Sequence, residues 1–143
     1  MNNVSTSNHI ECTKELNPPT NGLSVSFWVK VSSKSTNQVI FAHPNIEFGF
    51  LNNLGYVYTN NSIAGFTLNN FINNAWNYIV VIRNGATFQL YINNIAEIAN
   101  GGSNNYNHNK TVLWLLNRGN NNSYAANASI SDFRMYCTVL TED

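Results

Sequence analysis

The sequence predicts an all-β domain in which two antiparallel sheets pack face to face as a sandwich. Short runs of β-branched and aromatic residues recur along the chain, separated by turn residues about every eight to twelve positions, as in sandwiches and barrels. The run 23–31 (LSVSFWVKV) alternates apolar and polar residues along its whole length, which is typical of a strand with one buried face. No segment shows the apolar spacing of an amphipathic helix of about ten residues or more.

The clearest sheet-forming segment is 75–98 (AWNYIVVIRNGATFQLYINNIAEI), which we predict to form three strands joined by two tight turns. Asn84-Gly85 separates the first two strands and is typical of a type I′ turn, because Asn and Gly tolerate the positive φ angles that this turn needs. Asn93-Asn94 is predicted to form a second turn of the same kind. Such a meander has one polar-studded face, so a second sheet must bury its other face.

The other strands follow from the same patterns, interrupted by polar or Pro-containing breaks such as 17–22 (NPPTNG). In chain order, the predicted strands are 9–16, 23–31, 38–42, 46–51, 55–59, 63–68, 75–83, 86–92, 95–99, 112–117 and 128–136. Trp76 and Trp114 lie in strands that are apolar on both faces, so we expect both in the core. Residues 138–143 resemble the first turn of a helix.

Composition limits the classes of partner. Charged residues make up 10% of the 143 residues, the formal net charge is zero, and Lys and Arg are scattered singly, which argues against a nucleic-acid-binding protein. No run approaches the roughly eighteen apolar residues of a membrane-spanning helix, and the N-terminus shows no secretory signal. We expect residues 1–8 to form a flexible segment and 9–143 to form one domain without membrane insertion.

Asparagine is unusually frequent, at about a fifth of the chain. One interpretation is that a biased genome composition favours Asn, which fills loops because it accepts left-handed backbone conformations and makes local turns. The other interpretation is that loop amides bind sugar hydroxyls, because an amide offers both a donor and an acceptor. The two are compatible, and the sequence alone leaves both open.

Three stretches together resemble the laminin G-like, concanavalin A-like lectin and glucanase jelly-roll superfamily. They are 23–31 (LSVSFWVKV), 75–94 (AWNYIVVIRNGATFQLYINN) and 130–140 (ISDFRMYCTVL), in the order and spacing of that family. The resemblance implies two antiparallel sheets of roughly six strands each, with the first and last strands adjacent. It departs at Asn93-Asn94, where the family usually has Asp-Gly or Asn-Gly. It does not fix function, because the superfamily contains lectins, calcium-dependent adhesion modules, pentraxin-like binders and glucanases.

The chain has two cysteines, Cys12 and Cys137, near its two ends. In a reducing compartment they would be two separate thiols. The adjacency of the first and last strands that the resemblance implies would instead bring them within reach of a disulfide. Both states stay open at this point.

The acidic residues argue against hydrolysis. A retaining glycosidase needs two carboxylates about 5 Å apart, whereas Glu47 stands alone in the strand where the glucanases of this superfamily carry several acids. The three histidines lie in separate segments without a G-x-S-x-G context, and the cysteines lack zinc-ligand spacing. Asp132 is expected to bond nearby backbone or Arg134. We predict a non-catalytic protein without a cofactor; calcium is disfavoured because loops 100–110 and 118–127 contain no acid.

A sugar-binding site needs an aromatic platform beside amide or guanidinium groups, because a pyranose has an apolar C–H face and a polar rim. The candidates are aromatic and polar residues on the non-core face of a strand or in the long loops, which gather at the sheet ends of a sandwich. The candidate ligand-binding residues are Trp28, Tyr56, Tyr58, Tyr106, His108, Arg118 and Tyr124.

The predicted function is a lectin-like module that recognises a glycan or glycoprotein as part of a surface or secreted protein. The alternative is a structural or assembly protein, such as a virion or fibre-surface component, that forms a homo-oligomer or larger assembly. Near-zero net charge and low charge density suit this alternative. In either case we expect the protein outside the cell or exposed on a surface, in a virion under the alternative.

Overall fold

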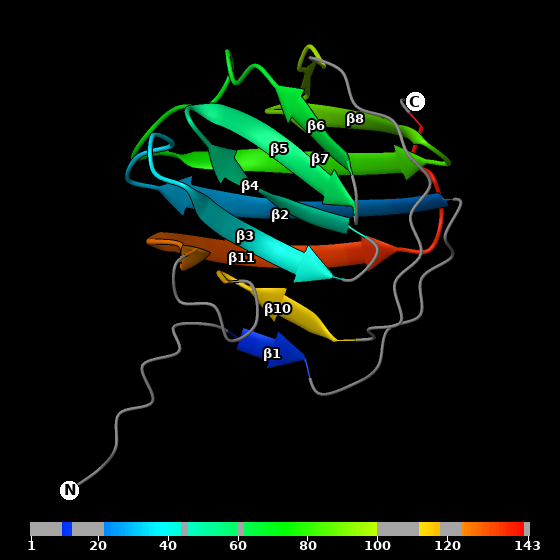
Figure 1. Ribbon diagram of the computed structural model, residues 1–143, viewed down its shortest axis with the longest axis horizontal. Coiled ribbons are helices and arrows are strands. Elements are labelled where there is room, and N and C mark those ends of the chain that lie inside the picture. The colour runs from blue at the N-terminus through cyan, green and yellow to red at the C-terminus, as the bar shows by residue number, and fades with distance from the viewer. Residues whose placement is uncertain are drawn as a thin grey trace, which may run out of the picture.

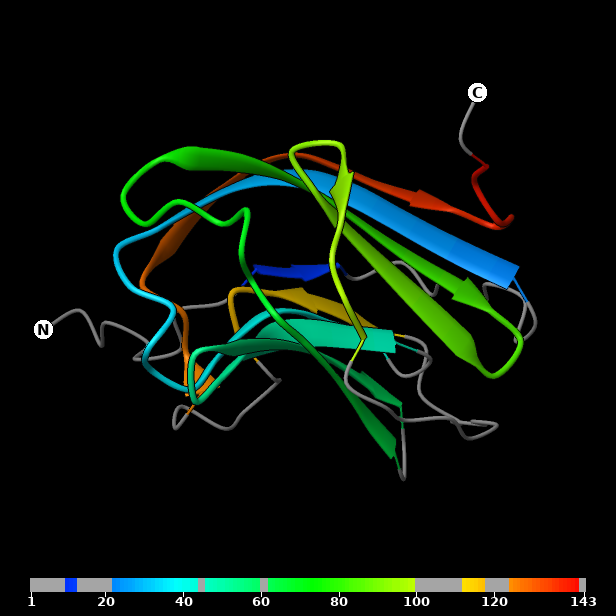
Figure 2. The ribbon, with the colours of Figure 1, turned by 90° about the horizontal axis from the view of Figure 1, so that it is seen from above.

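The computed structural model describes residues 10–12, 22–43, 46–59, 62–99, 112–117 and 124–141. These residues form eleven strands in two antiparallel sheets, which lie as two facing layers (Figures 1 and 2). The described part of the chain contains no α-helix, so the predicted all-β sandwich is confirmed. The predicted N-terminal segment 1–8 lies outside the described residues.

Each predicted strand corresponds to one observed strand, although the predicted strands 95–99 and 112–117 are each shorter in the structure. The larger sheet has six strands, in the order β1 (Ile10–Cys12), β10 (Leu113–Leu115), β3 (Gln38–His43), β4 (Ile46–Leu51), β5 (Leu54–Thr59) and β6 (Ser62–Phe66). The smaller sheet has five strands, in the order β11 (Ala128–Tyr136), β2 (Gly22–Val31), β7 (Trp76–Asn84), β8 (Thr87–Ile92) and β9 (Ile95–Ala96). The strands β7, β8 and β9 are the predicted meander.

The core lies between the two sheets and is centred on an aromatic cluster. Phe27 on β2 packs against Phe41 and Phe48 of the six-stranded sheet, with ring centroids 5.6 Å and 6.0 Å away. Phe133 on β11 stacks on Phe27 at 5.8 Å. The alternating apolar residues of β2 are all fully buried: Leu23, Val25, Phe27, Val29 and Val31. Each such side chain contributes about 1.5–3 kcal/mol of transfer free energy, so this strand ties the two sheets together.

Asparagine pairs form two of the tight turns. Asn93 and Asn94 have φ angles of 54° and 67°, so the second predicted turn, which needs positive φ at both central positions, is confirmed. Asn52 and Asn53, with φ angles of 52° and 69°, connect β4 to β5 in the same way. The first turn of the meander was predicted as a type I′ turn centred on Asn84-Gly85, and this position was wrong by one residue. The paired strands end at Asn84 and Thr87, and Gly85 alone of these turn residues has positive φ, as in a type II′ turn.

Two further expectations were wrong, and of the two cysteine states left open the structure has the free thiols. The first and last strands are not adjacent: β1 pairs with β10 in one sheet and β11 pairs with β2 in the other. Cys12 and Cys137, both described, are consequently not joined by a disulfide. Residues 138–141 form no helical turn, because the hydroxyl of Ser24 accepts from the backbone N–H of Leu140 and donates to the carbonyl of Thr138, which ties this segment to β2.

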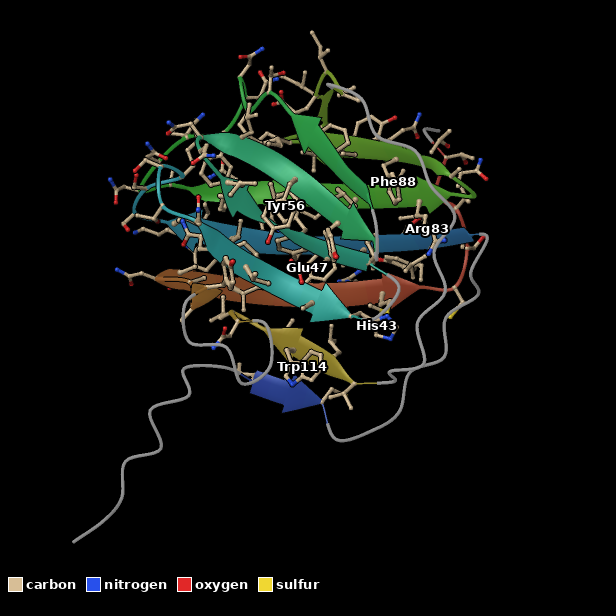
Figure 3. The ribbon with its side chains drawn as sticks, viewed as in Figure 1. His43, Glu47, Tyr56, Arg83, Phe88 and Trp114 are labelled. Carbon is tan, nitrogen blue, oxygen red and sulfur yellow. The ribbon has the colours of Figure 1, made fainter. Side chains whose placement is uncertain are left out.

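The outer face of the six-stranded sheet contains a buried polar pair. The hydroxyl of Tyr56 on β5 donates to Oε1 of Glu47 on β4 at 2.8 Å, and the two residues are only 6% and 5% exposed. Figure 3 shows the two side chains beside each other on this sheet. Tyr56 is directly opposite Gly49, and a Cβ atom there would lie 2.7 Å from the Tyr56 hydroxyl and 2.2 Å from the carbonyl oxygen of Gln38. Gly49 therefore leaves the space that the tyrosine ring occupies.

Gly49→Ala is expected to lower the free energy of unfolding by about 3 kcal/mol or more, because the carbonyl of Gln38 cannot move aside without disturbing the pairing of β3 with β4. Gly85→Ala provides the contrast: its Cβ would meet nothing, and only its left-handed backbone, at φ 57°, adds a cost of about 1–2 kcal/mol. Chemical denaturation of both variants measures the difference. Equal losses would mean that the close approach at Gly49 is not the cause.

Candidate functional site

The outer face of the five-stranded sheet carries exposed aromatic residues. On β2, the residues that alternate with the buried row point away from the core, and Trp28 and Lys30 among them are exposed. Trp28 is 41% exposed although it lies on a central strand of the sheet. A side chain of this size is normally covered on a central strand, so its exposure indicates a surface available to a partner.

Strand pairing places two more aromatic residues beside Trp28. Tyr78 on β7 is directly opposite Trp28, and their ring centroids are 5.3 Å apart. Trp76 is directly opposite Lys30 and is 46% exposed. Side chains opposite one another on an antiparallel pair lie on the same face. We name these four residues, Trp28, Lys30, Trp76 and Tyr78, the aromatic–lysine face.

A polar pocket adjoins the aromatic–lysine face at one end of the sheet. Figure 1 shows that β2 ends there and that β7 and β11 begin there. The pocket has a volume of about 230 Å³ and is lined by Lys30, Ser32, Asn74, Asn127, Ala128 and Ser129. Ser129 is opposite Lys30 on β11, just as Trp76 is opposite it on β7. Lys30 is thus shared by the pocket and the aromatic–lysine face.

Lys30 differs from the other described cations in its contacts. Lys34 Nζ donates to the carbonyl of Leu68 at 2.8 Å, and Arg83 Nε donates to the carbonyl of Gly85 at 3.2 Å. Arg134 Nε donates to Asp132 at 2.8 Å, which confirms the predicted pair and raises the pKa of Arg134. Within the described part of the chain, Lys30 alone among the cations makes no hydrogen bond or ion pair. Its ammonium group is available to a ligand.

A second pocket opens on the same outer face, at the opposite end of β7. It has a volume of about 230 Å³ and is mainly apolar. Its lining residues are Val80, Ile82, Tyr91, Asn94, Leu140 and Thr141. The pocket therefore extends the uncharged surface of β7 beyond Tyr78 but offers few polar groups to orient a ligand.

Two asparagines, Asn77 and Asn93, fix the start of β7, which carries Trp76 and Tyr78. Asn77 is fully buried, its Oδ1 accepts from the backbone N–H of Ile72, and its Nδ2 donates to the carbonyls of Ile72 and Ala75. Asn93 Nδ2 donates to Asn77 Oδ1, and Asn93 Oδ1 accepts from the backbone N–H of Tyr78 at 2.9 Å. The aromatic residues therefore stand on a backbone that is held by several hydrogen bonds.

The predicted site residues do not gather in one place. Trp28 lies in the aromatic–lysine face, whereas Tyr56 and Tyr58 lie on the outer face of the other sheet. Tyr56 is buried against Glu47, so its prediction as an exposed stacking platform was wrong. Tyr124 is half-buried next to Ala125, which pairs with Val39 of the six-stranded sheet. The remaining candidates lie outside the described residues: Tyr106, His108 and Arg118.

Sequence reasoning missed Trp76 and Tyr78. Trp76 was expected in the core, but it lies on the outer face at the first position of β7, and Trp114 also lies outside the core, half-buried on β10. The signal that could have identified Trp76 is the register between β2 and β7. Once Val29 is assigned to the core, its neighbour Lys30 and the residue opposite Lys30 must face outward.

Three of the described carboxylates are each bonded to a separate partner within the domain. Glu47 accepts from Tyr56, Glu97 accepts from the backbone N–H groups of Asn69 and Asn70, and Asp132 accepts from Arg134. Among the described residues, no group of three or more His, Cys, Asp or Glu side chains is placed to hold a metal ion. The part of the chain that the structure describes also has no helix long and apolar enough to span a membrane.

Comparison with known proteins agrees with this architecture. Residues 4–143 match the family model described as the concanavalin A-like lectin/glucanases superfamily. The chain belongs to this superfamily. No protein with a curated function matches the sequence.

Solved structures share the fold of this superfamily member at low identity. A heptameric SAP-like pentraxin from Limulus polyphemus is 14% identical, with a TM-score of 0.60 over 95% of this chain and 74% of the pentraxin. The binding domain of botulinum neurotoxin DC in complex with SialylT is 16% identical, with a TM-score of 0.59 over 85% of this chain. The chain covers only 33% of that toxin domain. Similarity at this level establishes a common fold and leaves function to the side chains.

Asn77→Ala is expected to lower the free energy of unfolding by about 2–4 kcal/mol, because it removes the acceptor of the Ile72 N–H, the donor to the carbonyls of Ile72 and Ala75, and one of the two acceptors of the Asn93 amide. Asn73→Ala is the matched control, since that side chain is exposed and makes no hydrogen bond in the described structure. Thermal and urea unfolding measure both. Equal stability of the two variants would contradict the assigned role of Asn77.

Proposed function

We propose that this domain is a non-catalytic recognition module that binds a glycan, free or on a glycoprotein, through the aromatic–lysine face. The observation that carries the proposal is the exposure of two tryptophans, Trp28 and Trp76, on one rigid sheet, beside a pocket lined by amide, hydroxyl and ammonium groups. Aromatic rings and polar groups side by side are what a sugar needs from a protein surface.

The chemistry of the face fits a sugar better than a purely apolar ligand. The apolar C–H face of a pyranose packs on an indole ring, and its hydroxyls need donors and acceptors around the ring edge. Asn74 and Asn127 offer both from one side chain, and Ser32 and Ser129 add hydroxyls. The pocket is smaller than the roughly 300–1,000 Å³ of a typical drug-sized ligand site, so it suits one sugar residue of a longer chain.

We also propose that the domain is not catalytic, because its described carboxylates are not arranged for hydrolysis. Although the superfamily includes glucanases, a glycosidase needs two carboxylates flanking one bond. The carboxylates of Glu47, Glu97 and Asp132 are each bonded to a different internal partner, and none lines the polar pocket. This arrangement supports binding rather than hydrolysis.

The structural relatives support recognition as the general role. Two of them are described as a neurotoxin binding domain in complex with SialylT or with rat synaptotagmin II. We extend to this chain only the idea that the fold presents a binding surface. The support for the position of the surface is the exposure of Trp28 and Trp76 beside the polar pocket.

Self-association is the second candidate, because the same exposed tryptophans would suit contact with another copy of the chain. The interspersed polar residues Lys30, Ser129 and Ser131 favour a sugar over a protein core. The long edge strand β11 is also interrupted by a bulge after Ser131, where Asp132 has a φ of 49°, and bulged edges resist pairing with further strands. A concentration-dependent oligomer in light scattering would favour this alternative.

Trp28→Ala and Trp76→Ala are each expected to weaken glycan binding by about five- to tenfold, because each removes a stacking surface worth about 1–1.5 kcal/mol. A glycan array identifies a bound oligosaccharide, and calorimetry on that oligosaccharide measures the affinity. The melting temperature should fall only modestly, since both side chains lie outside the inter-sheet core and are about half exposed.

Two control variants locate the binding face. Leu54→Ala removes a side chain of similar exposure, 39%, from the first position of β5. Trp114→Ala removes a tryptophan from the outer side of the six-stranded sheet. Both should bind like wild type. Loss of binding in Trp114→Ala with retention in Trp28→Ala would transfer the site to the other sheet. No glycan binding by the wild type would refute the proposed function.

A further inference from the structure

We propose that the glycan carries an acidic group, a carboxylate or a sulfate ester, and that Lys30 binds this group at the mouth of the polar pocket. The inference rests on the proposed function and adds the chemical class of the ligand. Lys30 would bind the acidic group, and Trp76, directly opposite Lys30, would stack on the sugar ring.

The first support is that nothing in the described structure uses the Lys30 ammonium group. The three other described cations donate to a carbonyl or a carboxylate of the domain, whereas Lys30 makes no such contact. Its carbon stem starts on a central strand, so the charge is anchored on the sheet and not on a loop. An ammonium group held near a pocket attracts an anion more strongly than it attracts a neutral sugar.

The second support is the character of the groups around Lys30. The residues opposite it are Ser129 on β11 and Trp76 on β7, both uncharged. The other pocket residues are Ser32, Asn74, Asn127 and Ala128, so Lys30 is the one charged side chain among the described lining residues. Asp132 lies on the same strand as Ser129 but is bonded to Arg134. The pocket therefore has a local positive charge with hydrogen-bond donors beside it, in a protein whose formal net charge is zero.

The third support is the spacing of Lys30 and Trp76. Directly opposite side chains on an antiparallel pair have Cβ atoms about 4.5–5.5 Å apart. A sugar ring lying on the Trp76 indole would thus place a substituent at its edge close to the ammonium group. A neutral sugar would leave that ammonium group without a partner and would displace part of its water.

The test compares wild type with Lys30→Gln on an array that carries neutral, sialylated and sulfated forms of the same core oligosaccharides. Wild type is expected to bind the acidic forms about two- to fivefold more tightly than the neutral form, because a charge pair at an exposed site contributes about 1 kcal/mol or less. Lys30→Gln should lose this preference and bind the acidic and neutral forms equally, whatever its affinity for the neutral form. The preference should also shrink as salt is raised, because exposed charges are screened.

Lys34→Gln is the matched control. It removes the same charge four residues along the chain, where Lys34 is bonded to the carbonyl of Leu68 and does not line the pocket. This variant should keep the preference for acidic glycans. The separate sialylated and sulfated arms distinguish a carboxylate from a sulfate as the group that Lys30 binds.

The outcomes separate this inference from the proposed function. Equal binding of neutral and acidic forms by wild type, or an unchanged preference in Lys30→Gln, overturns the acidic-ligand assignment and leaves glycan binding in place. Loss of the preference in Lys34→Gln as well would mean that net charge, not the position of Lys30, is responsible. No binding of any form would overturn both proposals.

Discussion

The pairing of β2 with β7 is the constraint on which the rest of the molecule depends. Nine consecutive residue pairs join the two strands, from Gly22 opposite Asn84 to Lys30 opposite Trp76. Because side chains alternate between the two faces, a slip of one residue would send Phe27 to solvent and Trp28 into the core. The burial of alternate β2 residues therefore selects a single register. That same register brings Trp28, Lys30, Trp76 and Tyr78 together on the opposite face.

The two outer faces of the sandwich are used differently. On the six-stranded sheet, Val39, Ala42, Glu47 and Tyr56 lie outside the inter-sheet core, yet all are buried. Glu47 and Tyr56 bond to each other there, which makes their polar atoms part of the stability of the domain rather than of a binding surface. On the five-stranded sheet, large aromatic side chains stay exposed. A binding surface is therefore expected on the five-stranded sheet, where large apolar side chains are exposed to solvent.

The sequence predicted the strands well because their patterns are local, and it predicted the site poorly because the site depends on register. Alternation in β2 and the asparagine pairs could be read from neighbouring residues. Trp76 could not be placed on a face without knowing that it lies opposite Lys30, and Tyr56 could not be recognised as buried without knowing that Gly49 lies beneath its ring. The position of a turn depends on strand pairing in the same way. Gly85 was correctly predicted as a turn residue, but Asn84 pairs with Thr87, which shifts the turn by one residue.

The asparagines have structural roles in turns and at the start of β7, and one of them also lines the polar pocket. Asn52 and Asn93 adopt left-handed backbone conformations in turns, and Asn77 satisfies buried backbone groups, so these residues stabilise the fold. Asn74 also has positive φ, at 60°, and its backbone N–H donates to the carbonyl of Val31, yet it lines the polar pocket beside Lys30. A turn that fixes the backbone leaves the amide side chain free to face a ligand. Structural use of asparagine at the end of a sheet can therefore create the polar rim that a sugar requires.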